Sequence, residues 1–204
     1  MRPFFRITFI LNYARDEQMK RLFDIVLASF ALIVLFLPFL LVMLAVKLTS
    51  RGPVFYWSDR VGFNNLLFKM PKFRSMRYGT PAVATHLLLD PKQYLTPIGN
   101  FIRKSSLDEL PQLWSILVGH MSFVGPRPAL FNQHDLIELR TQKNVHLLRP
   151  GLTGWAQING RDELPIPLKV GYDEYYVLNK SLIFDCKILF LTFLKVVRRD
   201  GVAH

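Results

Sequence analysis

Residues 25–46 read IVLASFALIVLFLPFLLVMLAV, and no charged side chain interrupts these 22 residues. As a straight helix they would measure about 33 Å, which is enough to cross the hydrocarbon core of a bilayer. A helix buried in a soluble core usually keeps one polar face, and this segment has none over about six turns. The segment therefore predicts a membrane anchor.

The flanks favour a helix that enters the membrane, bends and returns over one that crosses it. Pro38 removes a helix hydrogen bond just past the middle and predicts a kink. Basic residues stand on both sides of the segment, namely Lys20, Arg21, Lys47 and Arg51. Because Lys and Arg favour the cytoplasmic side, both ends are expected there. We therefore predict a re-entrant helix kinked at Pro38.

The composition indicates a polyanionic partner. The 204 residues carry a net charge of +11, and the pI is about 10.0. Such a balance suits nucleic acid, an anionic membrane surface or a phosphorylated substrate. The basic residues are spread without a known nucleic-acid-binding motif, and the apolar segment argues against that partner. The single cysteine, Cys186, excludes an internal disulfide and a multi-cysteine metal site.

The remaining pattern predicts an α+β, mostly helical fold with a small strand element. Short apolar runs at 54–57 and 66–68 flank a Gly-Asn turn and indicate two strands. Helices are expected at 97–103, 107–118, 129–143, 171–178 and 181–199. The last of these either packs on the body or lies in the membrane interface as an amphipathic helix, and the two interpretations weigh equally.

Three regions follow from these patterns. We expect residues 1–18 to form an N-terminal extension, residues 19–50 to form the membrane anchor, and residues 51–204 to form a domain on the cytosolic face that carries any catalytic site. The string Met-Lys-Arg at 19–21 precedes an apolar run, as a natural start often does. We therefore expect translation to begin at Met19, or residues 1–18 to form a short interfacial stretch.

The string SSLDELP at 105–111 is the strongest candidate for chemistry, and it has two interpretations. Ser106 and Glu109 match a capping box, in which the glutamate only satisfies a backbone donor, and this feature alone favours that structural role. The functional interpretation places Asp108 at a helix N-terminus, where an ionised carboxylate attacks phosphorus. Glu109 beside it would hold Mg²⁺.

Three further motifs supply candidate binding residues. The string GPRP at 125–128 fixes an arginine between two prolines, and a guanidinium suits bidentate binding of phosphate. The glycine-rich segment 150–161 offers Gln157 and Arg161 to a nucleotide or sugar. A basic cluster, which would line a phosphate site or rest on anionic headgroups, comprises Lys69, Lys72, Arg74 and Arg77. Each motif also has a plain structural interpretation, as a turn, a tight packing loop or a solvated basic face.

Several strings, taken in order, resemble the monotopic phosphoglycosyl transferases, also called the bacterial sugar transferase family. They are KRLFD at 20–24, KFRSM at 72–76, SLDELPQ at 106–112, MSFVGPRP at 121–128 and the segment 149–161. The resemblance extends from about Met19 to His204. One departure is Leu37, which precedes the kinking proline where the family often has serine.

The resemblance implies a two-step covalent reaction. Asp108 would attack the β-phosphate of a UDP-sugar, expel UMP and hold the phospho-sugar as an acyl phosphate. Polyprenyl phosphate, in particular undecaprenyl phosphate, would then accept the phospho-sugar. Glu109 would position Mg²⁺. From charge and position, we expect Arg103, Arg127 and Arg161 to contact the donor diphosphate, followed by Lys72 and Arg74. Gln157 of the glycine-rich segment completes the expected donor-binding residues.

The same resemblance implies a location and partners. The enzyme would lie at the cytoplasmic face of the bacterial inner membrane, in contact with anionic lipids and without nucleic acid. Its product would pass to further glycosyltransferases for O-antigen, capsule, exopolysaccharide or glycoprotein glycan. Galactose, glucose and N-acetylated deoxy-sugars all stay open as the sugar. The alternative is a non-catalytic membrane-surface protein that binds anionic lipid, and it predicts no need for Asp108.

Overall fold

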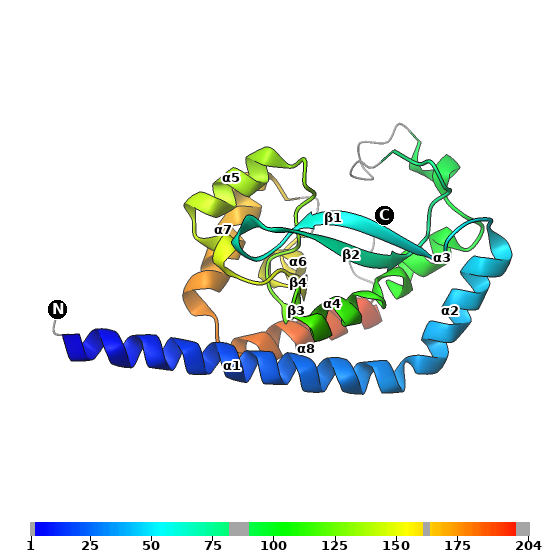
Figure 1. The fold of residues 1–204 in the computed structure, drawn as a ribbon. Coiled ribbons are helices and arrows are strands. Elements are labelled where there is room, and N and C mark those ends of the chain that lie inside the picture. Colours follow the sequence, from blue (N-terminus) through cyan, green and yellow to red (C-terminus); the bar gives the residue numbers. More distant parts are fainter. Residues whose placement is uncertain (1–2, 82–89, 161–163, 199–204) are drawn as a thin grey trace.

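The computed structural model describes residues 3–81, 90–160 and 164–198. Helices dominate, and two small sheets complete a mixed α+β fold, as the sequence predicted. Figure 1 shows a long helix, α1 (Pro3–Val34), running along one side of the molecule; its N-terminal part extends beyond the other elements, which lie over the rest of the helix. α1 continues through residues 18 and 19 without a break, so the predicted extension and the start of the anchor share one helix.

The anchor segment bends one turn before its proline. α1 ends at Val34, and α2 (Phe36–Thr49) leaves it at an angle of 64°. We predicted a kink at Pro38; the break occurs at Leu35 instead, because the proline ring clashes with the carbonyl four residues earlier and leaves it without a donor. Among the described residues, no single helix is long and apolar enough to span a membrane. The bent pair Asp16–Val34 and Phe36–Thr49, taken together, has the length and apolar composition of a span.

α2 leads into an antiparallel hairpin of β1 (Phe55–Val61) and β2 (Leu67–Phe73). A short 3₁₀ turn, η1 (Phe63–Asn65), joins the strands. Asn64 and Asn65 take left-handed backbone angles there, which asparagine tolerates better than most residues. The two predicted strands and their turn are therefore confirmed.

The middle of the chain consists of short elements. They are η3 (Pro91–Tyr94), α3 (Gly99–Lys104), η4 (Leu107–Glu109), α4 (Gln112–Val118), β3 (Ser122–Val124), α5 (His134–Gln142), η5 (Val145–Leu147), β4 (Gly151–Thr153) and α6 (Trp155–Ile158). The single helix predicted over 107–118 is wrong. Pro111 has no N–H to continue a helix, so the chain divides there into a 3₁₀ turn and α4.

Strands β3 and β4 pair in parallel and bring two of the glycine-containing motifs together. A Cβ on Gly154 would lie 2.1 Å from the carbonyl oxygen of Gly125, which is far inside van der Waals contact. Only glycine fits at this approach. The segment 150–160 therefore lies directly against the GPRP turn at 125–128.

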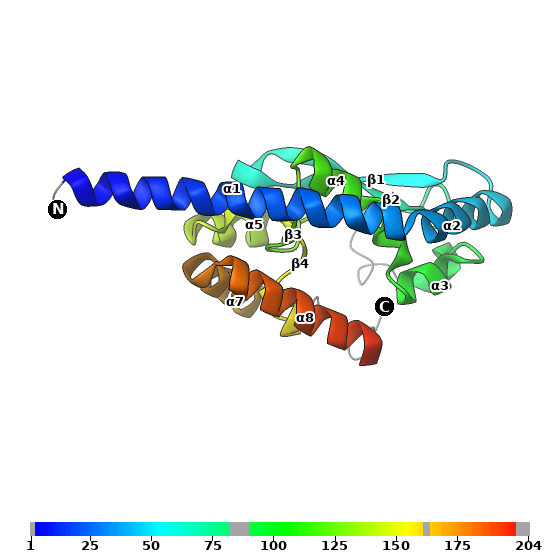
Figure 2. The same ribbon diagram turned by 90° about the horizontal axis from the view of Figure 1, so that it is seen from below.

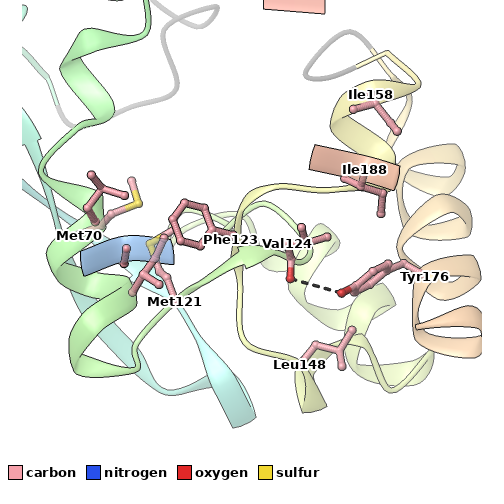
Figure 3. Packing of buried hydrophobic residues seen from close by; sticks show 11 residues of the cluster. Met70, Met121, Phe123, Val124, Leu148, Ile158, Tyr176 and Ile188 are labelled. Carbon is pink, nitrogen blue, oxygen red and sulfur yellow. Dashed lines mark hydrogen bonds between the residues drawn. The ribbon is translucent and has the colours of Figure 1, made fainter. Parts of the chain in front are cut away.

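The main hydrophobic core lies between α1, α4, β3 and the last helix, α8 (Leu182–Arg198). Ala28 of α1, Ile116 of α4 and Ile188 of α8 are fully buried in it. Figure 3 shows this packing, including Tyr176 of α7 (Ile166–Asn179), whose hydroxyl donates to the carbonyl of Val124 at 3.4 Å. Segments far apart in the sequence therefore meet in one core.

A second, smaller core fastens α2 to the body. Val42 and Val46 share a buried cluster with Phe73 at the end of β2 and Ile102 of α3. The ring of Phe39 lies against Phe73 with 4.9 Å between centroids. The bent pair is thus attached to the body at α2 as well as at α1.

Charged residues at the start of the anchor fasten α1 at three places. Lys20 forms an ion pair with Asp185 of α8. The guanidinium of Arg21 donates to the carbonyls of residues 116 and 117 at the C-terminal end of α4, where a cation is favourable. Asp24 accepts a hydrogen bond of 3.0 Å from the Phe123 N–H in β3. The string KRLFD at 20–24 therefore fixes α1 relative to α4, β3 and α8.

The predicted final helix is confirmed as α8, and it has two faces. Asp185 and Ile188 are buried against the body, whereas Ile183, Phe190 and Phe193 are exposed. Figure 2, seen from below, shows α1 and α8 on the same side of the molecule. The helix therefore packs on the body and leaves apolar side chains exposed.

Candidate active site

The Asp-Glu pair lies on a single 3₁₀ turn between two short helices. α3 ends before it, η4 carries both acids, and α4 begins after it. Ser106 has a left-handed backbone conformation, with φ of +56°, that turns the chain ahead of the pair. The side chain of Asp108 is buried, at 8% exposure, and Glu109 is partly buried. The two neighbouring acids therefore meet different surroundings.

The capping box that this string resembles does not form. The side chain of Ser106 makes no capping hydrogen bond; only its carbonyl accepts from the Glu109 N–H, at 3.2 Å. The carboxylate of Glu109 turns instead to Lys72 and Arg127. The structural interpretation of the string is therefore wrong, and Glu109 belongs to a charged cluster.

Basic side chains hold Glu109 in its ionised form. Lys72 Nζ, from β2, lies 2.7 Å from Glu109 Oε1, and Arg127 Nη2 lies 3.6 Å from the same oxygen. Burial, the largest single effect, would raise the pKa of this carboxyl, but Lys72, Arg127 and Arg60 together lower the pKa to about 2. Glu109 is therefore an anion at neutral pH.

Asp108 has the opposite electrostatic balance. Burial raises the pKa of Asp108 to about 6, and the Glu109 anion adds to the rise. The charge of Lys72, and to a smaller extent the charges of Arg103 and Arg127, lower the pKa of Asp108 and so oppose this rise. At pH 7 the ionised form outnumbers the protonated form by about ten to one. An ionised carboxylate shielded from water is suited to attack an electrophile that its cationic neighbours hold in place.

Hydrogen bonds with other elements fix the backbone of the GPRP turn at 125–128, from which the Arg127 side chain extends. Backbone hydrogen bonds to β4 hold its first two residues, at 2.9 Å each. Arg140 donates to the carbonyl of Arg127 at 2.7 Å, and Arg60 donates to the carbonyl of the second proline at 3.1 Å. The turn therefore presents the Arg127 side chain to the acid pair from a fixed backbone.

The structure brings five of the predicted residues together. Asp108 and Glu109 meet Lys72 from β2, Arg103 from α3 and Arg127 from the GPRP turn. These elements come from three separate strings of the sequence, and their charges all act on the acid pair. The assembled group is two carboxylates among three cations.

The other predicted binding residues lie elsewhere. Gln157 of α6 is buried beneath Gly154, and neither atom of its amide group has a hydrogen-bond partner in the described protein. Arg74 is buried and donates to the backbone of residues 50 and 51, which holds the connection from α2 to β1. Arg161 lies outside the described residues. Donor binding by these three residues stays a prediction.

Arg60 and the buried pair of Arg140 and Asp173 were not among the residues predicted from the sequence. Arg140 lies in α5, whose polar sequence is typical of a solvated helix, and its partner is 33 residues away. The one local signal is spacing, because Arg140 follows the buried Leu136 by four residues and shares its face of the helix. Arg60 gives no such signal.

The acid pair also provides ligands of the kind that a hard cation prefers. Among the described residues, no group of three or more His, Cys, Asp or Glu side chains is placed to hold a metal ion. Mg²⁺ needs fewer, because it binds proteins through one or two carboxylates and takes its other ligands from substrate phosphates and water. The ionised Glu109 and its neighbour Asp108 fit that requirement.

The chain matches the model of the bacterial sugar transferase family over residues 15–199. It is 41% identical over 186 residues to the uncharacterized sugar transferase EpsL of Bacillus subtilis (strain 168), and the match covers 90% of each chain. It is 41% identical over 189 residues to the UDP-glucose:undecaprenyl-phosphate glucose-1-phosphate transferase of Escherichia coli (strain K12), covering 88% of this chain and 40% of that one. It is 39% identical over 202 residues to the undecaprenyl-phosphate galactose phosphotransferase of Salmonella typhimurium (strain LT2), covering 90% of this chain and 41% of that one. The chain therefore belongs to the bacterial sugar transferase family.

Proposed function

We propose that this chain transfers a sugar-1-phosphate from a UDP-sugar to a polyprenyl phosphate and releases UMP. The names of the E. coli and Salmonella relatives support this class of reaction. The observation that carries the proposal is the buried Asp108 carboxylate beside an ionised Glu109, with Lys72, Arg103 and Arg127 around them. A nucleophilic acid among cations suits a donor that carries two phosphates.

In the first proposed step, an oxygen of Asp108 attacks the β-phosphorus of the donor. A phosphorus–oxygen bond forms to the carboxylate while the bond from the β-phosphorus to the bridging oxygen breaks. That oxygen keeps the electron pair and leaves as part of UMP. Lys72, Arg103 and Arg127 offset the charge that builds on the phosphate oxygens. The phospho-sugar then remains on Asp108 as an acyl phosphate.

In the second step, an anionic oxygen of the polyprenyl phosphate attacks the phosphorus of the acyl phosphate. The bond to Asp108 breaks, its electron pair returns to the carboxylate, and a polyprenyl diphosphate sugar is released. Lys72 supports this departure, because it opposes the rise in the pKa of Asp108 and so stabilises the carboxylate that leaves. The product is a lipid-linked sugar that glycosyltransferases would extend into a glycan.

We propose Mg²⁺ as the cofactor, held by Glu109. The support is the low pKa of this carboxyl, which keeps it anionic, and the adjacent second carboxylate. When bound, Mg²⁺ supplies charge neutralisation to the donor phosphates. The protein's part is to hold Glu109 against Lys72 and Arg127 so that its orientation is fixed before the ion arrives.

We propose a re-entrant anchor at the cytoplasmic face of the inner membrane. In support, the anchor exposes large apolar side chains, among them Phe30, Ile33, Phe36 and Leu41. α8, which Figure 2 shows on the same side of the molecule as α1, also exposes apolar side chains, as suits a helix in the interface. A lipid phosphate at the membrane surface would then face the body of the enzyme, with anionic lipids against its basic flanks.

UMP release from a panel of UDP-sugars tests this function. The purified chain would be assayed with undecaprenyl phosphate and Mg²⁺, as wild type, as Asp108→Asn and as Asp59→Asn. Asp59 is a matched control, because it is an exposed carboxylate paired with Lys69 on the hairpin. We expect UMP from one or a few donors with wild type and Asp59→Asn, and none with Asp108→Asn. Without acceptor, intact-mass measurement should show a phospho-sugar adduct on wild type and on Asp59→Asn, and none on Asp108→Asn.

Two results would contradict the proposal. Equal UMP release by Asp108→Asn would remove this residue as the nucleophile. A chain that binds anionic vesicles but releases no UMP from any donor would be a lipid-binding protein without this activity.

A further inference from the structure

The backbone at Arg127 accepts hydrogen bonds from two side chains of other elements. The Arg127 side chain faces Glu109, with 3.6 Å between Arg127 Nη2 and Glu109 Oε1. The Arg127 carbonyl accepts the 2.7 Å hydrogen bond from Arg140 Nη1. The next carbonyl accepts from Arg60 at 3.1 Å. Two prolines already restrict this turn, so these donors fix a backbone that has little freedom left.

Arg140 reaches this carbonyl from a buried ion pair. Its Nε and Nη2 donate to Asp173 Oδ2 of α7 at 2.9 and 2.6 Å. Arg140 is 7% exposed and Asp173 is 2% exposed. The fork of the guanidinium therefore serves two acceptors, with two nitrogens on the carboxylate and the third on the backbone of Arg127.

Stability alone is a weak reason for such a pair. Removing both charges from water costs about as much as their attraction returns, and apolar replacements are often as stable. Burial accordingly raises the pKa of Asp173, although Arg140 opposes the rise. Support of the Arg127 backbone explains the presence of the Arg140–Asp173 pair better than stability does.

We infer that Arg140 and Asp173 are positioning residues for Arg127, and that they set the direction in which its guanidinium meets the donor diphosphate. Neither residue touches the acid pair. Asp173 orients Arg140, Arg140 holds the Arg127 carbonyl, and the turn transmits that position to the side chain. The inference rests on the proposed function, in which Arg127 contacts the donor phosphates.

The competing explanation is that the pair only docks α5 on α7. A second ion pair joins the end of α5 to α7, between Lys143, which caps α5, and Glu174 at 3.1 Å; their side chains are 51% and 35% exposed. The Lys143–Glu174 pair does not contact the GPRP turn. Its removal therefore tests the docking of the two helices without changing the support of Arg127. Arg140→Lys also distinguishes docking from positioning. The lysine ammonium can still pair with Asp173, but it lacks the planar guanidinium that reaches both Asp173 and the Arg127 carbonyl.

The test is a double-mutant cycle on UMP release. Values of kcat and KM for the preferred UDP-sugar would be measured for Arg140→Lys and Lys143→Met, each in the wild-type and the Arg127→Ala background. Thermal unfolding of every variant would be recorded alongside. If Arg140→Lys does not fold, Asp173→Asn takes its place in the same cycle, since it removes the charge and keeps the side-chain shape.

We expect Arg140→Lys to lower kcat/KM about 10- to 100-fold, the loss that a displacement of about 1 Å produces at a reacting centre. The loss should divide between kcat and KM as it does for Arg127→Ala. In the Arg127→Ala background, Arg140→Lys should cost less than about twofold more, because the residue it positions is gone. Lys143→Met should stay within about twofold of wild type in both backgrounds.

Three outcomes would overturn the inference. The first is an equal loss from Arg140→Lys in both backgrounds, which would mean that it does not act through Arg127. The second is wild-type activity of Arg140→Lys, and the third is a matching loss in Lys143→Met, which would assign both pairs to docking. A different pattern, with no UMP from wild type or full activity in Asp108→Asn, refutes the proposed function itself, and this inference falls with it.

Discussion

Replacing Lys72 with methionine should move the acid limb of the pH profile of UMP release. Lys72 is the strongest of the groups that lower the pKa of Asp108, and its Nζ lies 2.7 Å from Glu109. Methionine keeps much of the length of the side chain and removes its charge. Asp108 then faces the Glu109 anion with only Arg103 and Arg127 opposing it.

The size of the shift follows from the charges. An opposite charge within about 4–6 Å typically lowers a carboxyl pKa by about 1–3 units. From a wild-type pKa of about 6 for Asp108, loss of Lys72 should bring the pKa to neutral pH or above. The ionised fraction at pH 7 then falls from about nine tenths to half or less. Because Asp108 attacks as the carboxylate, the rate should fall with that fraction.

The assay is kcat/KM for UMP release from pH 5 to 9, which reports ionisations of the unliganded enzyme. We expect an acid limb with its midpoint near pH 6 in wild type, at least about one unit higher in Lys72→Met, and unchanged in Lys69→Met. Lys69 lies on the same strand, and its partner Asp59 is exposed. A limb that stays in place, with activity reduced equally at every pH, would refute the reasoning. Lys72 would then act by contacting substrate and not by setting the pKa of Asp108.

Three further predictions concern stability. The folded-state pKa of Asp108, about 6, lies above its unfolded value of 3.8, so ionisation of this carboxyl destabilises the fold as pH rises from about 4 through 6. Asp108→Asn should therefore stabilise the chain at pH 7 by up to about 3 kcal/mol. Thermal unfolding should show this gain shrinking as the pH is lowered toward about 4. Gly154→Ala should lower the free energy of unfolding by about 1–3 kcal/mol, because its Cβ would collide with the Gly125 carbonyl. The control Gly171→Ala lies in an open stretch of α7 and should be neutral or raise the free energy of unfolding by up to about 1 kcal/mol. Denaturant unfolding measures both. Arg21→Met should cost about 1–3 kcal/mol in the same measurement, because two carbonyls at the end of α4 lose their charged donor; a cost like that of an exposed cation would show that this contact does not hold α1.

The parts of the fold that the sequence predicted are those that local pattern decides. The uncharged run at 25–46 and its proline indicated a long apolar helix with a bend, and apolar runs around a Gly-Asn turn indicated the hairpin. The proline predicted a bend but not its position, because proline acts on the carbonyl one turn earlier and the break therefore falls at Leu35. Pro111 acted similarly by dividing the predicted helix at 107–118.

The candidate site could be predicted only as separate strings. The string at 106–109 is compatible both with a capping box and with a charged cluster, and only the distant partner Lys72 decides between them. Lys72 and Arg74 look equivalent, two residues apart in one basic cluster. The first turns to Glu109, and the second turns to backbone carbonyls at residues 50 and 51. Such partners depend on tertiary packing, which local pattern does not contain.

The attachment of both α1 and α2 to the body restricts how the length of the bent pair can change. α1 is fastened through Lys20, Asp24 and Ala28, and α2 through Val42 and Val46. One residue inserted between these attachments would turn everything after it by about 100° and advance it by about 1.5 Å. Val42 and Val46 would then leave their cluster with Phe73. Exchange of one apolar residue for another is therefore compatible with exposed positions between the attachments, such as Phe30, Ile33 and Leu37, whereas an insertion or deletion there separates α2 from its cluster on the body.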